Sequence, residues 1–419
     1  MKRTAFALMA TLLMSAFAGG SAQSQNLTLD SPGLPALPQS QDKLPDTAHP
    51  YFTYKPYPGP VEDTRALADR PGPPTTIPLS SLTFKASKDG RTYTDVIVGR
   101  SPLSSPRVTT SVNVMIVPLV FNIEVTPTAV FSTIVANSCG TSKGHTDIAN
   151  FIDSPIIKPV TFDGSAAAGH AARMNGFSMG TGTYNDEFRR AEFLSFIGGV
   201  GSPYHTAFNV TQHAAVGINV PSSVGTTNGS GCGRFGEVSY TAWDAFVQAT
   251  LLPFVKATPS TFVVFLAHDV VLFDNTLSNC CILGYHGAES NDQTYGFIDY
   301  DTTGRFSGVS DSSVAAHEVG EWLDDPFGNN PTPAWGHIGQ VSQCQGNWEV
   351  GDPLSGTLFP KILGTNGVTF SAQELAFWGW YYSADHDANF KVGAAGFYSN
   401  NATFKGPSKV CPPGGTFTN

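Results

Sequence analysis

The chain has 419 residues, a net charge of −10 and a pI of about 5.4. A negative charge of this size repels phosphate groups, so it argues against nucleic acid and anionic membranes as partners. Only 13% of the residues are charged, and together with 43 Gly this composition is typical of a secreted, loop-rich protein.

The first residues predict a cleavable secretory signal over residues 1–22. Lys2 and Arg3 form a positive start, residues 4–17 form an apolar run, and small residues follow through Ala22. We expect cleavage after Ala18 or Ala22. The apolar run is too short to span a membrane, and no later run approaches the required length of about 20 residues. The sequence therefore predicts a secreted or periplasmic protein without a membrane span.

Residues 23–80 form a proline-rich extension, which holds 12 of the 30 prolines. This composition favours extended chain with little packing, so it predicts a linker or a strap that lies over the following domain. Residues 81–419 are expected to form a single α+β domain with a mixed sheet.

Turn and periodicity signals predict the elements of this domain in chain order. The Asp89-Gly90 turn indicates a hairpin, and an Asn or Asp cap is expected before the first helix. The predicted strands are 83–86, 92–98, 112–121, 261–266, 281–286 and 294–300, and the predicted helices are 185–196, 239–256 and a segment that contains His317.

Six cysteines are spread along the chain without the spacing of a zinc ribbon, so disulfides are expected. The adjacent Cys280 and Cys281 are expected to pair with different partners. The other four are Cys139, Cys232, Cys344 and Cys411.

The most informative segment is His317-Glu318-Val319-Gly320-Glu321. Residues four apart on a helix share one face, so His317 and Glu321 are expected to point at the same place with Glu318 beside them. This is the H-E-x-x-H layout of metallohydrolases with a carboxylate in place of the second imidazole. The alternative is a solvated acidic helix that happens to contain a histidine.

Charge around this segment favours a metal ion. No Lys or Arg lies between Arg305 and Lys361, whereas seven Asp and Glu do. Carboxylates without basic partners repel one another unless solvent or a cation separates them. Asp324 and Asp325 also fall at the C-terminal end of the helix, just before Pro326, which ends it. Negative charge is unfavourable at this end of the helix dipole. A segment that departs from such a rule without visible compensation is a place to expect function.

A catalytic metal usually takes three protein ligands, so a third must come from elsewhere. Glu349 and Asp352 are the best candidates. In the gluzincin arrangement a downstream Glu completes the sphere and an Asp orients a histidine ligand, which makes Glu349 the ligand and Asp352 the orienting residue, or the reverse. The alternative is an acidic surface turn.

His286 precedes the helix on a predicted strand, where it would polarise a substrate carbonyl or add a ligand. A core histidine is the competing interpretation. His268 and Asp269 resemble a catalytic pair, but no G-x-S-x-G motif accompanies them, which argues against a serine hydrolase.

These residues together resemble the pattern of the EXORDIUM or phosphate-induced protein 1 family and of related bacterial secreted proteins. The likeness covers roughly residues 261–383. It rests on Gly284-Tyr285-His286, His317-Glu318-x-x-Glu321, Asp325-Pro326, Trp335, Glu349-Val350-Gly351-Asp352 and the aromatic segment 374–382. Members of the family often carry a Cys just after the motif that corresponds to Glu349-Val350-Gly351-Asp352. Pro353 and Leu354 follow it here, so the family's local disulfide is not implied.

The resemblance and the order of elements imply a zincin-like domain, in which an edge strand above the active-site helix holds an extended substrate. The metal would polarise a water and a peptide carbonyl, and Glu318 would act as general base on that water. Zn²⁺ is the first candidate, with Mn²⁺ or Ca²⁺ as alternatives because the ligands are rich in oxygen. The competing hypothesis is a non-catalytic extracellular or envelope-associated binding protein with a structural metal.

Overall fold

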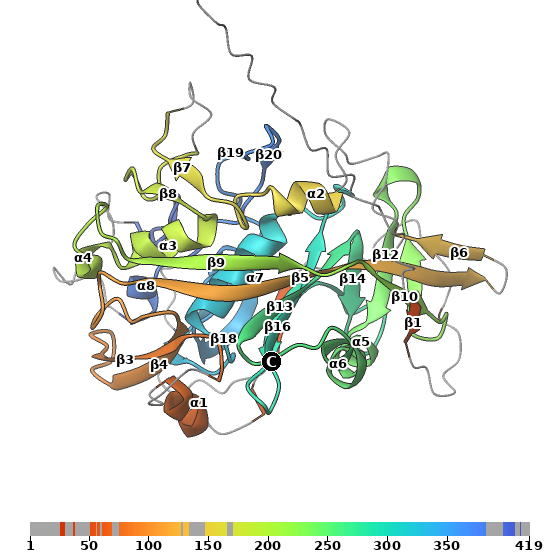
Figure 1. Ribbon diagram of the computed structural model, residues 1–419, viewed down its shortest axis with the longest axis horizontal. Helices are drawn as coiled ribbons and strands as arrows, with labels where there is room; N and C mark the ends of the chain where they lie inside the picture. Colours follow the sequence, from red (N-terminus) through yellow and green to blue (C-terminus); the bar gives the residue numbers. More distant parts are fainter. Residues whose placement is uncertain are drawn as a thin grey trace, which may run out of the picture.

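The computed structural model describes residues 26–29, 37, 51–55, 57–58, 61–68, 75–126, 129–133, 147–165, 171–382, 397–406 and 411. Within these ranges the protein is a mixed α+β structure, mostly sheet with few helices. The long strands β5 and β9 pair side by side across the molecule (Figure 1). The predicted signal at residues 1–22 lies outside the described residues.

Twelve strands of the described residues form one sheet, in the order β1-β10-β5-β13-β16-β15-β14-β12-β11, with β2 paired to β15 and with β6 and β9 paired to β5. The sheet is mixed, because β5, β13 and β16 are parallel neighbours whereas β15 runs antiparallel to β16. Its strands are β1 Asn26–Thr28, β2 Tyr51–Lys55, β5 Thr109–Thr126, β6 Ala129–Ser132, β9 His205–Gln212, β10 Val216–Val220, β11 Gly225–Asn228, β12 Phe235–Ser239, β13 Thr261–His268, β14 Val270–Phe273, β15 Cys280–Ala288 and β16 Thr294–Tyr300.

Smaller sheets and helices surround the large sheet. The pairs are β3 Leu79–Lys85 with β4 Thr92–Val98, β7 Val160–Phe162 with β8 Gly180–Gly182, β17 Pro331–Ile338 with β18 Val341–Asn347, and β19 Ile362–Leu363 with β20 Thr369–Phe370. The helices are α1 Val61–Ala68, α2 Asp147–Ile152, α3 Tyr184–Glu192, α4 Leu194–Ile197, α5 Tyr240–Phe246, α6 Leu252–Phe254, α7 Ser313–Asp324 and α8 Trp378–Tyr382, with short helical turns at Gly231–Gly233, Val247–Leu251 and Asp352–Leu354.

Side-chain alternation along the strands separates two cores. On β13, Phe262 and Val264 enter the core that contains α7, whereas Val263 and Phe265 enter the core that contains α5. Successive residues of a strand point to opposite faces, so the sheet is covered by helices on both sides. The ring of Phe262 stacks on Trp322 of α7 at 3.9 Å. This packing fixes α7 against one face of the sheet.

Two short strands of the proline-rich extension join the large sheet. β1 pairs in parallel with β10, and β2 pairs in parallel with β15. Backbone pairing of this kind is what a strap over the domain requires, and it places residues 51–55 beside the strand that carries His286.

Several local predictions are confirmed, and two are wrong. The hairpin of β3 and β4, the strands β5, β13, β15 and β16, and the helix α7 lie where the sequence predicts them. The predicted helix 185–196 is divided into α3 and α4, and the predicted helix 239–256 into α5, the turn Val247–Leu251 and α6. The cap of α3 is Thr183, whose side chain accepts from the backbone N–H of Asp186, in place of the expected Asn or Asp.

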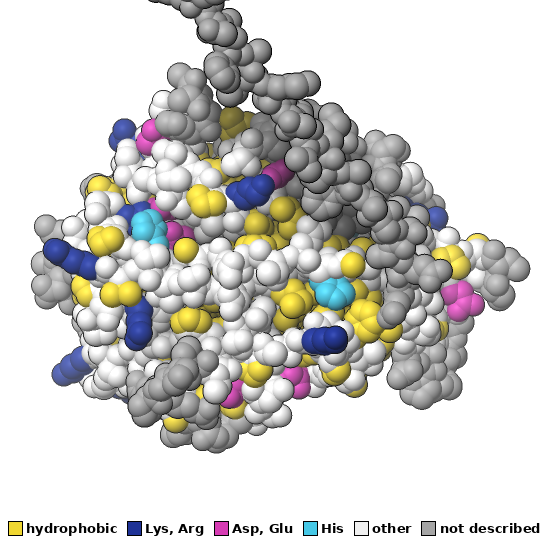
Figure 2. Space-filling view, in the orientation of Figure 1, with side chains coloured by type: hydrophobic (Ala, Val, Ile, Leu, Met, Phe, Trp, Pro, Cys, Tyr) yellow, Lys and Arg dark blue, Asp and Glu magenta, His cyan; other side chains and the backbone are white. Residues whose placement is uncertain are grey.

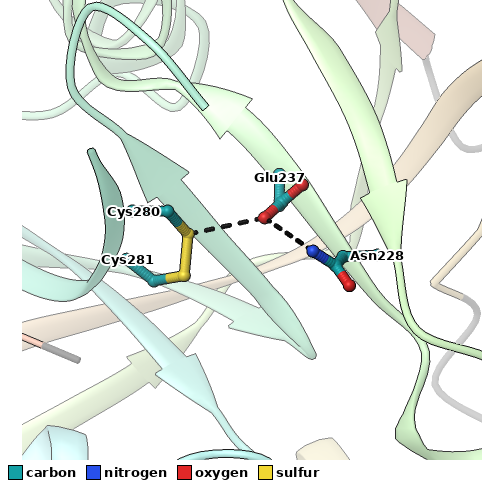
Figure 3. Close-up of a disulfide and its surroundings, with 4 residues drawn as sticks. All are labelled: Asn228, Glu237, Cys280 and Cys281. Atoms are coloured by element: carbon teal, nitrogen blue, oxygen red, sulfur yellow. Dashed lines mark hydrogen bonds between the residues drawn. A yellow bond between two sulfur atoms is a disulfide. The ribbon is translucent and has the colours of Figure 1, made fainter. Parts of the chain in front are cut away.

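The prediction that Cys280 and Cys281 have different partners is also wrong, because they bond to each other (Figure 3). Neighbouring strand residues normally face opposite sides, but the peptide bond between these two is cis, which sequence rarely signals. Cys344 pairs with Cys411. The predicted presence of disulfides is thus confirmed, whereas Cys139 lies outside the described residues.

None of the helices in the described ranges is long and apolar enough to cross a membrane.

Candidate metal centre

Six predicted site residues converge where α7 faces β15 and the loop after β18. His317, Glu318 and Glu321 come from α7, and His286 comes from β15. Glu349 and Asp352 follow β18. All six side chains are buried, and the most exposed residue, Asp352, is 6% exposed. On the face of the molecule in Figure 2, acidic side chains appear singly, whereas this acidic cluster is internal.

One group of donor atoms belongs to His317, Glu321 and Asp352. The Nε2 atom of His317 lies 3.0 Å from Oε1 of Glu321 and 3.5 Å from Oδ1 of Asp352. The predicted helical geometry explains the first contact, because residues four apart share a face. The backbone N–H of Gly351 donates to Glu321 Oε1 at 3.1 Å, which connects α7 to the acidic loop.

A second group consists of His286, Glu318 and Glu321. His286 Nδ1 lies 3.4 Å from Glu318 Oε2 and 3.7 Å from Glu321 Oε2. Its Nε2–H donates to the backbone carbonyl of Asp325 at 3.1 Å. This bond assigns the proton to Nε2, so the lone pair of Nδ1 faces the two carboxylates. In each group the donor atoms lie within 4.8 Å of one another, close enough to hold a metal ion, and Glu321 belongs to both.

The structure separates the two residues that the sequence left as alternative third ligands. Asp352 lies in the His317 group, and its two oxygens accept from the side chains of Gln340 and Gln345. Glu349 lies on the His286 side, with its Oε2 3.9 Å from His286 Nε2. Its other oxygen accepts from Asn347 at 2.9 Å.

Unpaired donor atoms make the cluster suitable for a cation. His317 Nδ1, Glu318 Oε1 and Glu349 Oε2 are buried without a hydrogen-bond partner. No Lys or Arg within the described ranges forms an ion pair with Glu318, Glu321, Glu349 or Asp352. Buried polar atoms are costly when unpaired, and imidazole with carboxylate is a donor set that Zn²⁺ and harder divalent ions accept.

Burial sets the titration of this cluster. Burial raises the pKa of Glu318 and Glu349 well above their usual range, and neighbouring carboxylates add to the effect. Burial also lowers the pKa of His286 to about 3. His317 behaves differently: burial lowers its pKa, but Glu321 and the other nearby acids more than offset this, and the net shift is upward. A cation in the cluster would relieve the same repulsion that these shifts express.

Two glycines make room for the cluster. A Cβ atom on Gly351 would lie 2.4 Å from Nδ1 of His317, and one on Gly284 would lie 2.6 Å from Oε1 of Glu318. Both positions need a residue without a side chain. Gly284 and Gly351 lie close to His286 and Asp352 in the sequence, and glycines at such positions can indicate that another side chain packs closely against the backbone.

The acidic end of α7 proves to be compensated by distant parts of the chain. Asp324 forms a buried ion pair at 3.1 Å with Arg189 of α3. The carboxylate of Asp325 accepts from the backbone N–H groups of Asn329 and Asn330, both at 2.9 Å. These two acids therefore have structural partners, which the sequence around α7 does not reveal.

Sequence reasoning missed the residues that cover the site. The ring of Phe52 stacks on the His317 ring with centroids 3.8 Å apart. Gln340, in the turn after β17, bonds to both the backbone N–H and the backbone carbonyl of Phe52 and also to Asp352. An isolated Phe in a proline-rich segment carries no signal of this contact, because the two residues are far apart in the chain.

A separate group combines Glu237 with the Cys280–Cys281 disulfide (Figure 3). Glu237 Oε1 accepts from Asn228 at 3.3 Å and lies 3.5 Å from Cys280 Sγ. The sulfurs are bonded to each other, so they are not thiolate ligands. Burial raises the pKa of Glu237 from 4.5 to about 7, although the bond from Asn228 opposes the shift.

Glu237→Gln is expected to make stability less dependent on pH. Because the folded-state pKa is raised, the contribution of Glu237 is fully present below pH 4.5 and is lost as the pH rises through 7. The rise from 4.5 to about 7 corresponds to about 3 kcal/mol. Calorimetric melting of both proteins between pH 4.5 and 8 measures the effect, and an identical pH profile for the two would contradict it.

Comparisons with protein-family models, curated proteins and solved structures find no match to this chain.

Proposed function

We propose that this protein is a secreted or periplasmic metal-dependent hydrolase of peptides with a zincin-like fold. The observation that carries the proposal is that two buried donor groups share Glu321, with Glu349 3.9 Å from His286 beside them. Within the described residues, the ion pairs of the four carboxylates are with His286 and His317 and not with Lys or Arg. The resemblance to the EXORDIUM or phosphate-induced protein 1 family and the predicted signal at residues 1–22 support the same proposal.

His317, Glu321 and Asp352 would hold the metal ion, because their donor atoms already lie close together. Glu349 then stays beside His286, as a residue that shapes the charge of the cluster. Zn²⁺ is the first candidate, and the oxygen-rich set leaves Mn²⁺ and Ca²⁺ as alternatives.

A bound divalent cation supplies Lewis acidity, which activates water and polarises a carbonyl at neutral pH. Glu318 moves the proton: it accepts one from the attacking water and delivers it to the leaving amine as the peptide C–N bond breaks. Once Glu318 has taken the proton, the Nδ1 lone pair of His286, 3.4 Å away, would accept a hydrogen bond from it and orient the carboxyl toward the leaving amine. The Asp325 carbonyl in turn fixes the ring of His286.

A second candidate function is that of an extracellular or envelope-associated binding protein with a structural metal. One observation favours it: all six cluster side chains are buried, so a substrate does not reach them in this conformation. A structural site is closed in this way, whereas a catalytic site keeps a position for water or substrate.

Elemental analysis of the purified protein, paired with digestion of a peptide library, tests the proposal. We expect about one equivalent of metal and peptide hydrolysis that a chelator abolishes and added metal restores. Protein that binds no divalent metal would overturn both functions, and full metal content without hydrolysis would favour the binding protein.

Glu321→Ala is expected to remove the metal and lower the melting temperature in either case, because Glu321 belongs to both donor groups. Elemental analysis and thermal melting of the same sample measure the two effects. Glu124→Ala on β5, outside the cluster, is the matched control and should retain the metal. Normal metal content in Glu321→Ala would remove this residue from the ligand set.

A further inference from the structure

One edge of strand β15 lies next to the candidate metal centre, and β2 occupies this edge. β15 pairs with β16 along Gly284–Ala288, and on its other side β14 pairs only near Cys280 and Ile282. β2 fills the remaining edge, with Phe52 opposite Gly284 and Tyr54 opposite His286. Without β2, the backbone of β15 beside His286 would be an open edge, which is a surface that binds extended peptides by strand addition.

Side chains of β2 close the centre from above. The Phe52 ring covers His317 at 3.8 Å, and the Tyr54 ring lies 6.3 Å from that of His286. Tyr54 also packs against Gly328, where a Cβ atom would lie 2.4 Å from the Tyr54 ring. Two aromatic residues of one pentapeptide thus lie over the two imidazoles of the cluster.

The contacts that hold β2 are of two kinds. At the centre, Gln340 accepts from the Phe52 N–H at 2.9 Å and donates to the Phe52 carbonyl at 2.8 Å. At the far end, Lys55 forms ion pairs with Asp244 at 3.0 Å and with Glu289 at 3.5 Å. The Phe52 carbonyl therefore accepts a hydrogen bond from the Gln340 side chain and does not point at His317 or Glu321.

We propose that the edge of β15 from Gly284 to Gly287 binds the backbone of an extended peptide substrate, and that residues 51–55 occupy this subsite as an intramolecular competitor. The inference rests on the proposed function and specifies its substrate class: an extended peptide with an aromatic side chain over His317. Opening of β2 is then the event that admits substrate, and the engaged Phe52 carbonyl explains why the segment is not itself cleaved.

The test compares four full-length proteins loaded with zinc: wild type, Phe52→Ala, Lys55→Met and Tyr51→Ala. Tyr51 is the matched control, because it is an aromatic residue of the same strand that packs against the opposite core. The first measurement is the rate at which zinc passes to a chromogenic chelator. The second is the binding of a labelled pentapeptide with the sequence of residues 51–55, followed by fluorescence anisotropy.

Phe52→Ala is expected to accelerate zinc transfer by about tenfold or more and to bind the labelled peptide, because loss of a buried aromatic contact favours local opening. Wild type and Tyr51→Ala are expected to bind the peptide at least about tenfold more weakly, because β2 leaves the β15 edge open in only a small fraction of these molecules. Lys55→Met is the second variant. It weakens the far end of β2 without touching the cluster, and it should change both measurements in the same direction.

Unchanged zinc transfer and no peptide binding in both Phe52→Ala and Lys55→Met would overturn the inference and make β2 a permanent wall of the centre. Equal binding by all four proteins would overturn it too, because the peptide would then bind elsewhere. Neither measurement needs hydrolysis. Peptide binding by the opened variants without cleavage of any library peptide would therefore support the subsite and refute the hydrolase.

Discussion

Replacing Glu318 with Gln is expected to lower kcat for peptide hydrolysis by about 10²- to 10⁴-fold, the range for loss of a general base. Metal content and melting temperature should stay close to those of the wild type. The reason is that the proposed ligands are His317, Glu321 and Asp352, so the exchange at Glu318 removes none of them. Gln has the same shape, and its amide can donate to His286 Nδ1, which lies 3.4 Å from the Glu318 carboxyl.

Steady-state kinetics on a library-derived peptide, with elemental analysis of the same sample, measures this effect. Glu237→Gln is the matched control, since it makes the same change at a buried Glu outside the cluster and should keep full activity. Wild-type kcat in Glu318→Gln would exclude Glu318 from proton transfer. Loss of metal from that variant would instead make Glu318 a ligand, as the second donor group allows.

The helical part of the site was predictable because its geometry is local. Four residues separate His317 from Glu321, and a helix brings such residues to one face whatever surrounds it. The acidic loop was predictable as a source of donors, because a metal needs a third ligand. Its internal arrangement was not: the choice between Glu349 and Asp352 depends on how Gly351 bonds to Glu321.

The parts that sequence did not predict depend on contacts between distant residues. Phe52 reaches His317 only because β2 pairs with β15, and a single Phe among prolines shows no periodicity. Strands such as β9 and β11 were missed because they are rich in Thr, Asn and Gly and lack an apolar run. Sequence therefore located the cluster but not the segment that covers it.

The charge pattern around α7 was informative for one reason and misleading for another. The absence of local Lys and Arg correctly indicated an acidic cluster, because Glu318, Glu321, Glu349 and Asp352 converge. The same absence suggested that Asp324 lacked a partner. Its partner is Arg189 of α3, which the fold brings to 3.1 Å.

Arg189→Met is expected to cost about 3–5 kcal/mol of stability, the range for removing one partner of a buried ion pair. Both side chains of the pair are fully buried, so the carboxylate of Asp324 would lose its compensating charge without gaining water. Arg189 also donates to the backbone carbonyls of Val98 and Leu323, which connects α3 with β4 and with the end of α7. Urea unfolding of the two proteins at pH 8 measures the loss.

The double variant Arg189→Met with Asp324→Leu separates charge from packing. It should recover part of the lost stability, because replacing both partners by apolar groups removes the buried charge, although the two carbonyls stay without their donor.

The pH dependence gives a further check. Burial raises the pKa of Asp324 to about 6 even with Arg189 beside it, so removal of Arg189 must raise it further. A raised folded-state pKa means that stability is lost as the pH rises, so the defect of the single variant should be smaller at pH 5 than at pH 8. An equal defect at both pH values, unrelieved in the double variant, would show that the lost backbone bonds and not the unpaired carboxylate account for the effect.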